Sequence, residues 1–115
     1  MTVGTSCDCN SGIVTVKLLD KGQVVASAKG VQGKELRLSV QNPTLWSPSN
    51  PYLYDMTVSL SKDGKVLDEV KSYTAFRKIS SKRDAAGIMR MQLNNQDLFQ
   101  FGPLDQGWWP DGIYT

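Results

Sequence analysis

The sequence predicts an all-β domain: an immunoglobulin-like antiparallel β-sandwich followed by an irregular C-terminal tail. Three observations favour this fold class. Apolar residues recur with a period of two along most of the chain. Short turns rich in glycine, aspartate and asparagine separate the alternating segments, and no segment has the period of a helix. The chain has 115 residues, which is the size of one ordinary domain.

Six segments carry the alternation expected of strands with one buried and one solvated face. They are residues 14–19, 24–28, 35–40, 52–60, 66–79 and 88–93, and residues 98–101 complete the last hairpin. Turns are expected at 20–22, 62–65 and 94–95, because glycine and asparagine tolerate positive φ.

Residues 41–51 are expected to form a connection, because Pro43, Pro48 and Pro51 cannot donate to a β-ladder. Trp46 lies in the middle of this connection, and we expect it to be a buried core anchor at one end of the sandwich.

Tyr52 and Tyr54 alternate in phase with the apolar residues of 56–60, so we expect both on the core face. The alternative interpretation is a surface platform, formed with Trp46, on which a sugar could stack.

Composition excludes several classes of function. Thirteen Lys and Arg against eleven Asp and Glu give a net charge of +2, which favours neither nucleic acid nor a membrane as partner. The chain has no His, the commonest general base and metal ligand. No apolar run is long enough for a transmembrane helix, and the first twelve residues lack the regions of a signal peptide. We therefore expect no catalytic, cofactor-binding or metal-binding residues.

The two cysteines, Cys7 and Cys9, are separated by one residue. A disulfide across that spacing is geometrically awkward, and two ligands are too few for a structural metal site. We expect two reduced thiols in a flexible N-terminal segment.

Three segments resemble a known family. Residues 45–54, LWSPSNPYLY, closely resemble a signature of the immunoglobulin-like domain of glycoside hydrolase family 2, which contains β-galactosidases, β-mannosidases and β-glucuronidases. Residues 74–79, TAFRKI, resemble the strand that closes this domain, and residues 91–102, MQLNNQDLFQFG, resemble the hairpin leading into the family's barrel. Ala75 and Asn95 stand where the family usually has Gly. The structural signature comprises Trp46, Pro48, Pro51, Tyr52, Tyr54 and Arg77.

The resemblance implies a fragment of a larger enzyme. In the family, a jelly-roll domain precedes this sandwich, and a TIM barrel carrying the catalytic Glu residues follows it. This chain has only Glu35 and Glu69, and neither matches a catalytic motif, so both are expected to be solvated strand residues. The parent is expected to be a bacterial O-glycosyl hydrolase of a divergent subgroup, periplasmic or secreted.

The expected function is therefore a non-catalytic spacer that orients the barrel. A carbohydrate-binding module that uses the tail aromatics and a fibronectin-like protein-interaction domain are the alternatives. The expected organisation is a flexible segment at 1–12, the sandwich at 13–80, the barrel-directed hairpin at 81–102 and the aromatic tail at 103–115.

The tail holds the candidate contact residues. Trp108 and Trp109 could pack against the barrel or stack on sugar, and Asp105 and Asp111 could bind sugar hydroxyls or form turns. Exposed aromatics could also drive self-association through the tail. Arg77 is expected either to bridge to a neighbouring domain or to form a local salt bridge.

Overall fold

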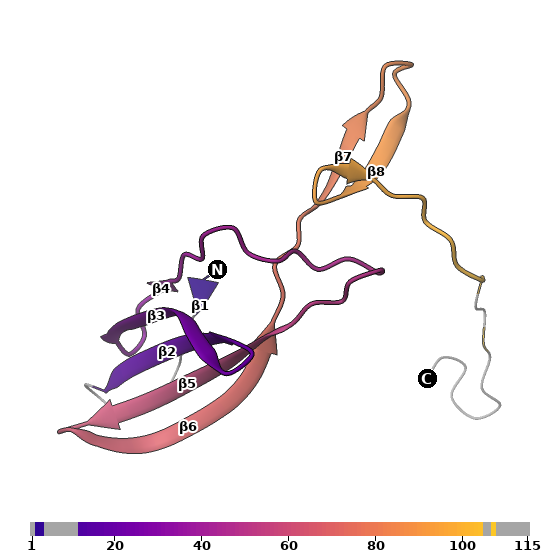
Figure 1. Ribbon diagram of the computed structural model, residues 1–115. Helices are drawn as coiled ribbons and strands as arrows, with labels where there is room; N and C mark the ends of the chain where they lie inside the picture. The colour runs from indigo at the N-terminus through magenta and orange to yellow at the C-terminus, as the bar shows by residue number, and fades with distance from the viewer. Residues whose placement is uncertain (1, 4–11, 105–106, 108–115) are drawn as a thin grey trace. The chain divides into compact units, whose positions relative to one another are not determined.

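The computed structural model describes residues 2–3, 12–104 and 107 (Figure 1). The chain divides into two compact units, Met1–Arg77 and Lys78–Thr115. The described residues form antiparallel sheets and contain no helix. The prediction of an all-β fold is confirmed, and the structure is consistent with a β-sandwich.

Nine strands occur among the described residues. They are β1 (Thr2–Val3), β2 (Ile13–Asp20), β3 (Gln23–Val31), β4 (Leu36–Arg37), β5 (Tyr54–Lys62), β6 (Lys65–Thr74), β7 (Ile79–Arg83), β8 (Met89–Leu93) and β9 (Gln96–Asp97).

The first unit is organised around a four-stranded sheet in the order β3-β2-β5-β6. Two tight hairpins build it, and both lie where the sequence predicts them. Lys21 and Gly22 have φ of 49° and 84°, and Asp63 and Gly64 have φ of 49° and 77°. Positive φ at both central residues gives a turn whose twist matches the twist of the flanking strands.

The core lies on one face of this sheet. On the inner strand β2, Val14, Val16 and Leu18 are buried. Their partners on β3 are the small residues Gly30, Ala28 and Ala26. A Cβ atom at Gly30 would lie 2.5 Å from Leu36 Cδ2. The absence of a side chain at Gly30 therefore leaves room for Leu36, which belongs to the layer that covers this face of the sheet. The buried set is Val14, Val16, Leu18, Leu36, Leu38 and Tyr54.

The covering layer contains the two-stranded sheet β1-β4. The predicted strand at 35–40 is shorter than expected, because only Leu36 and Arg37 pair with β1. The alternation nevertheless continues, since Leu38 is buried and Val40 packs against the core. Thus the N-terminal segment, expected to be flexible over 1–12, contributes one strand; residues 4–11, including both cysteines, lie outside the described residues.

The connection returns to the sheet through a short parallel bridge between Leu45 and Phe76, and the Trp46 N–H donates to the Phe76 carbonyl at 2.9 Å. Because Phe76 pairs with this connection, β6 ends at Thr74 instead of continuing to residue 79 as predicted.

The expectation that Trp46 is a buried core anchor is wrong. Trp46 is half-buried and lies outside the set of residues that pack on the core. The buried aromatic is Tyr54, 2% exposed, whose ring contacts Tyr52 and Phe76 edge-to-face, each at 5.2 Å. The core-face assignment of Tyr52 and Tyr54 is therefore confirmed.

The second unit is a small three-stranded sheet, β7-β8-β9. The predicted Asn94-Asn95 turn is present, with φ of 55° and 66°. Lys78 and Asn94 close the sheet, since the Asn94 N–H donates to the Lys78 carbonyl and the Lys78 N–H donates to Asn94 Oδ1. The hairpin expected from residue 81 begins at Ile79, and no described residue of this unit is buried.

Candidate functional site

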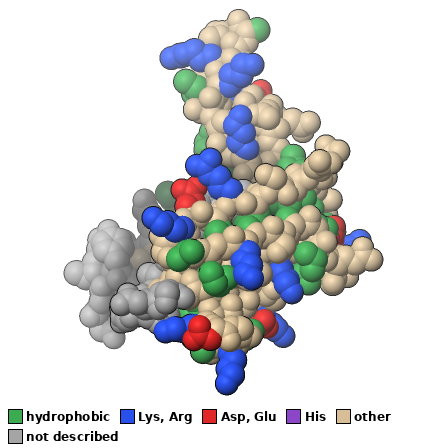
Figure 2. All heavy atoms as spheres, turned by 90° about the vertical axis from the view of Figure 1, so that its left-hand side faces the viewer, with side chains coloured by type: hydrophobic (Ala, Val, Ile, Leu, Met, Phe, Trp, Pro, Cys, Tyr) green, Lys and Arg blue, Asp and Glu red, His purple; other side chains and the backbone are tan. Residues whose placement is uncertain are grey.

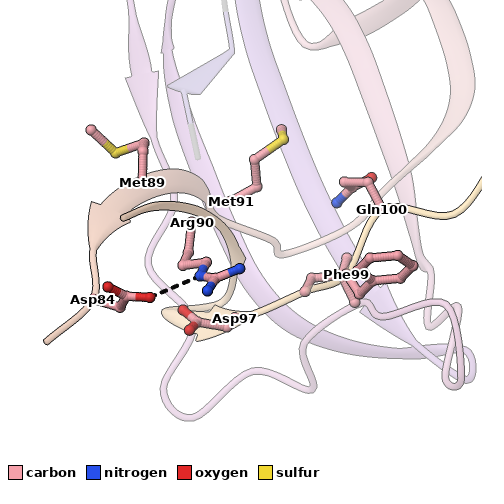
Figure 3. A pocket seen from close by; sticks show the side chains of 8 residues that line it. Asp84, Met89, Arg90, Met91, Asp97, Phe99 and Gln100 are labelled. Atoms are coloured by element: carbon pink, nitrogen blue, oxygen red, sulfur yellow. Dashed lines mark hydrogen bonds and ion pairs between the residues drawn. The ribbon is translucent and has the colours of Figure 1, made fainter. Parts of the chain in front are cut away.

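The second unit carries an open pocket of about 630 Å³ (Figure 3). It lies between the first residues of β8 and the segment that runs from the end of β9 to Gln100. Its lining combines two carboxylates, a guanidinium group and several apolar side chains. The lining residues are Asp84, Met89, Arg90, Met91, Asp97, Leu98, Phe99 and Gln100.

Asp84 organises the loop that joins β7 to β8. Its Oδ1 accepts the backbone N–H groups of Ala86 and Ile88, both at 2.9 Å, and its Oδ2 accepts Arg90 Nε at 2.9 Å. The ion pair with Arg90 and the amide of Ile88 hold the pKa of Asp84 below its ordinary value. A carboxylate held ionised by three donors is suited to fixing a turn, whereas a general acid requires a raised pKa.

Asp97 is also engaged within the unit. Its Oδ1 accepts Gln92 Nε2 at 2.8 Å across the β8–β9 pair. Both carboxylates of the pocket therefore stabilise the local hairpin geometry.

The apolar side chains around the pocket are the unusual feature of this unit. Met89 and Met91 are each more than half exposed, and Phe99 is 88% exposed. Phe101 is 94% exposed. Figure 3 shows Met89, Met91 and Phe99 standing away from the charged Asp84–Arg90 pair. An apolar surface of this kind, beside a polar rim, is typical of a docking site for another protein surface.

A second, smaller pocket of about 340 Å³ lies in the first unit. The Arg77 guanidinium sits over the Trp46 ring, 5.1 Å from its centroid, which is a cation–π geometry. The expected local salt bridge of Arg77 does not occur among the described residues, and the expected bridge to a neighbouring domain stays a prediction. The lining is Trp46, Leu53, Tyr73, Thr74, Ala75 and Arg77.

Tyr52 joins the connection to the four-stranded sheet by a side-chain hydrogen bond. Its hydroxyl donates to Asp20 Oδ1 at 2.5 Å and joins the connection to the end of β2. This hydrogen bond, together with desolvation and the nearby negative charge, raises the pKa of Tyr52 to about 12. The Tyr54 hydroxyl accepts the Thr44 N–H at 2.8 Å, so both tyrosines fix the connection onto the sheet.

The sequence-predicted site residues divide into two groups. Asp105, Trp108, Trp109 and Asp111 lie outside the described residues. Of the signature residues, Tyr52, Tyr54, Trp46 and Arg77 gather around the connection, while Pro48 and Pro51 are exposed within it. Glu35 and Glu69 are exposed, as expected.

The described residues contain neither a cluster of metal ligands nor a membrane-spanning helix. No group of three or more His, Cys, Asp or Glu side chains there could hold a metal ion. No helix in that part of the chain is long and apolar enough to cross a membrane. On the face shown in Figure 2, lysine and arginine side chains are scattered among neutral ones.

The sequence pattern did not mark Met89, Met91 and Phe99 as candidate site residues. Their alternation was visible, but alternation shows only that a strand has an apolar face. It does not show whether that face is covered within the same chain.

Comparison with known proteins decides the family. The family model of the glycosyl hydrolases family 2 matches residues 5–77, which include the LWSPSNPYLY segment. The chain belongs to glycosyl hydrolase family 2. The resemblance carried by residues 45–54 is therefore confirmed, and the sandwich of the first unit is the matched region.

Individual relatives are glycosidases of bacteria. A β-galactosidase of Thermoanaerobacter pseudethanolicus is 24% identical over 115 residues, covering 92% of this chain and 16% of the relative. A β-glucuronidase of Paenibacillus borealis is 37% identical over 81 residues, covering 67% of this chain and 13% of the relative. The solved β-glucuronidase of Ruminococcus gnavus superposes with a TM-score of 0.64 and 28% identity, over 78% of this chain and 14% of that one. The family 2 chain thus spans only 13–16% of the length of these three proteins.

Proposed function

We propose that this chain is the non-catalytic sandwich domain of a longer family 2 glycosidase, and that its second unit docks on the catalytic barrel and orients it. The parent activity would be hydrolysis of an O-glycosidic bond. The chain itself would position the catalytic barrel and would supply no reacting group.

The observation that carries this proposal is the missing core of the second unit. None of its described residues is buried, and most of its described large apolar side chains are more than half exposed. A three-stranded sheet needs an apolar face covered by another layer to be stable in water. The relatives are about five to six times as long as this chain, so their remaining sequence offers a covering partner.

The carboxylates support the non-catalytic part of the proposal. Asp84 is held ionised by its three donors, and Asp97 is bonded to Gln92. Glu35 pairs with Arg37 at 3.0 Å on the surface, and Glu69 is exposed on a regular strand. Retaining glycoside hydrolysis requires two carboxyl groups that face each other across a sugar cleft. Each of these four side chains instead bonds to a group of its own unit or is exposed on a regular strand.

A chimera tests the docking role. The matching segment of the Ruminococcus gnavus β-glucuronidase is replaced with this chain, and β-glucuronidase activity and thermal stability are measured. The active chimera should lose activity and stability when Met91→Glu or Phe99→Glu places a charge in the docking surface. Val31→Glu, which changes an apolar residue of the first unit as exposed as Met91, is the matched control and should have little effect.

Two results would overturn the proposed function, the first its docking part and the second its non-catalytic part. One is a chimera that tolerates both hairpin substitutions as well as it tolerates the control. The other is hydrolysis of aryl glycosides by the purified 115-residue chain, abolished by Glu35→Gln or Glu69→Gln, because it would make the chain an enzyme.

A second candidate function is carbohydrate binding at the pocket lined by Trp46, Tyr73 and Arg77. It is favoured by the indole and phenol rings, by the guanidinium donors and by the absence of any acidic side chain from its described lining. That lining suits a pyranose with a carboxylate. Titration with D-glucuronate, followed by NMR, should shift the Trp46 indole N–H signal more than D-glucose does. Equal shifts, or shifts unchanged by Arg77→Gln, would exclude this function.

A further inference from the structure

The last strand of the four-stranded sheet, β6, is an uncovered edge. It pairs with β5 on one side, and no other strand of the described chain pairs with its outer side (Figure 1). Nine of its ten residues are exposed, and only Thr74 is partly covered. Its outward backbone N–H and C=O groups are therefore available to another strand.

The side chains of β6 are unusual for an edge exposed to water. Val70 lies opposite Val58, which packs on the core, so Val70 is on the core face of the sheet. It is nevertheless 54% exposed. Val66 and Leu67, earlier on the strand, are also more than half exposed. Burial of these apolar groups would favour association.

The sequence neighbours of Val70, Glu69 and Lys71, carry opposite charges and lie on the other, solvated face of the sheet. Glu69 lies opposite Ser59, and Lys71 lies opposite Thr57. Neither charge belongs to an ion pair among the described residues. The strand thus presents an acid and a base, two residues apart, on the same face and on either side of an apolar residue.

We propose that β6 pairs antiparallel with β6 of a second copy of this chain, with Val70 opposite Val70. In this register, Glu69 faces Lys71 of the second copy, and Lys71 faces its Glu69. The two-fold axis makes both ion pairs identical, as in any isologous interface. The two four-stranded sheets become one continuous sheet, and the two Val70 side chains meet on the core face.

The charges select this register over its neighbours. Opposite residues of an antiparallel pair lie on the same face, so a change of register moves the axis by one residue along the strand. One such change places Glu69 opposite Glu69, and the other places Lys71 opposite Lys71. Like charges directly opposite each other are destabilising, and opposite charges are stabilising.

Charge exchange tests the pairing. Sedimentation equilibrium of the 115-residue chain gives the dimer dissociation constant for the wild type, Lys71→Glu, Glu69→Lys and the double variant that exchanges the two charges. Each single substitution creates two like-charge pairs and should raise the constant about tenfold or more. The double variant restores both pairs and should return the constant to within about threefold of the wild type.

A matched control separates edge pairing from general charge effects. Lys29→Glu makes the same change on β3, the opposite edge of the sheet, and should leave the dissociation constant unchanged. Circular dichroism should show that all variants are folded, because each altered residue is exposed.

Three results would overturn the proposal. The first is a wild-type chain that stays monomeric at the highest concentration tested. The second is a double variant as weak as the single variants. The third is a dimer that persists in all variants, which would place association elsewhere, as at the tail aromatics. Each result is independent of the docking role proposed for the second unit, because β6 belongs to the first unit.

Discussion

Leu18→Ala tests the centre of the core. Leu18 is 0% exposed on β2, and its ladder partners are Ala26 on β3 and Met56 on β5. Removing three carbon atoms costs about 2.4 kcal/mol of transfer free energy at roughly 0.8 kcal/mol per methylene. The cavity adds to this, because β2 is held by a strand on each side and cannot collapse inward. We expect a total of about 3–4 kcal/mol, within the usual range for buried Leu→Ala substitutions.

Urea unfolding followed by circular dichroism measures this change. With an m-value of about 1–1.5 kcal/mol/M for a domain of this size, the midpoint should fall by about 2–4 M. Val31→Ala, at an exposed position on the edge strand β3, is the control and should cost less than about 1 kcal/mol. If Leu18→Ala unfolds within 1 M of the wild type, β2 is not the centre of the core.

Three further predictions concern single side chains. The hydrogen bond to Asp20 favours the protonated Tyr52 hydroxyl, so the stabilisation that this bond gives the fold should be complete below pH 10 and lost as pH rises to about 12. In Asp20→Asn, tyrosinate absorbance should show the Tyr52 pKa nearer its ordinary value. Asp84→Ala should free the amides of its loop and speed their hydrogen exchange, whereas Asp84→Asn should retain part of the protection. Trp46→Ala should cost about 1–2 kcal/mol in urea unfolding, less than the loss of a fully buried Trp, and a larger loss would show that Trp46 is a core residue.

The sequence could predict the sheet of the first unit because one face of it is buried. A one-residue slip would turn Val14, Val16 and Leu18 toward solvent, so the alternation determines which face meets the core. The turns were equally readable, because Asp63-Gly64 and Asn94-Asn95 require positive φ.

Other features depend on long-range contacts that periodicity does not contain. The length of β4 is limited by its partner β1, which has only two residues. The end of β6 is determined by the bridge between Leu45 and Phe76, two residues far apart in the sequence. Trp46 is half-buried because Tyr54, and not Trp46, fills the space beneath the connection.

The candidate site was predictable only in part. The LWSPSNPYLY segment identified the family, and its Tyr52 and Tyr54 do lie at the core. The exposed apolar surface of the second unit was not predictable, because Met89 and Met91 have the alternation of an ordinary buried face. Whether such a face is covered depends on contacts that the alternation of residues does not contain.

Hydrogen exchange of the second unit tests the docking role most directly. The backbone amides of β7 and β8 are measured in the isolated chain and in the Ruminococcus gnavus chimera, with the amides of β2 as an internal reference. In the isolated chain, β7 and β8 should exchange far faster than β2, because no described residue of their unit is buried. In the chimera, their exchange should slow by about a hundredfold or more as the barrel covers Met91 and Phe99. Equal, slow exchange of β7, β8 and β2 in the isolated chain, unchanged in the chimera, would contradict the account.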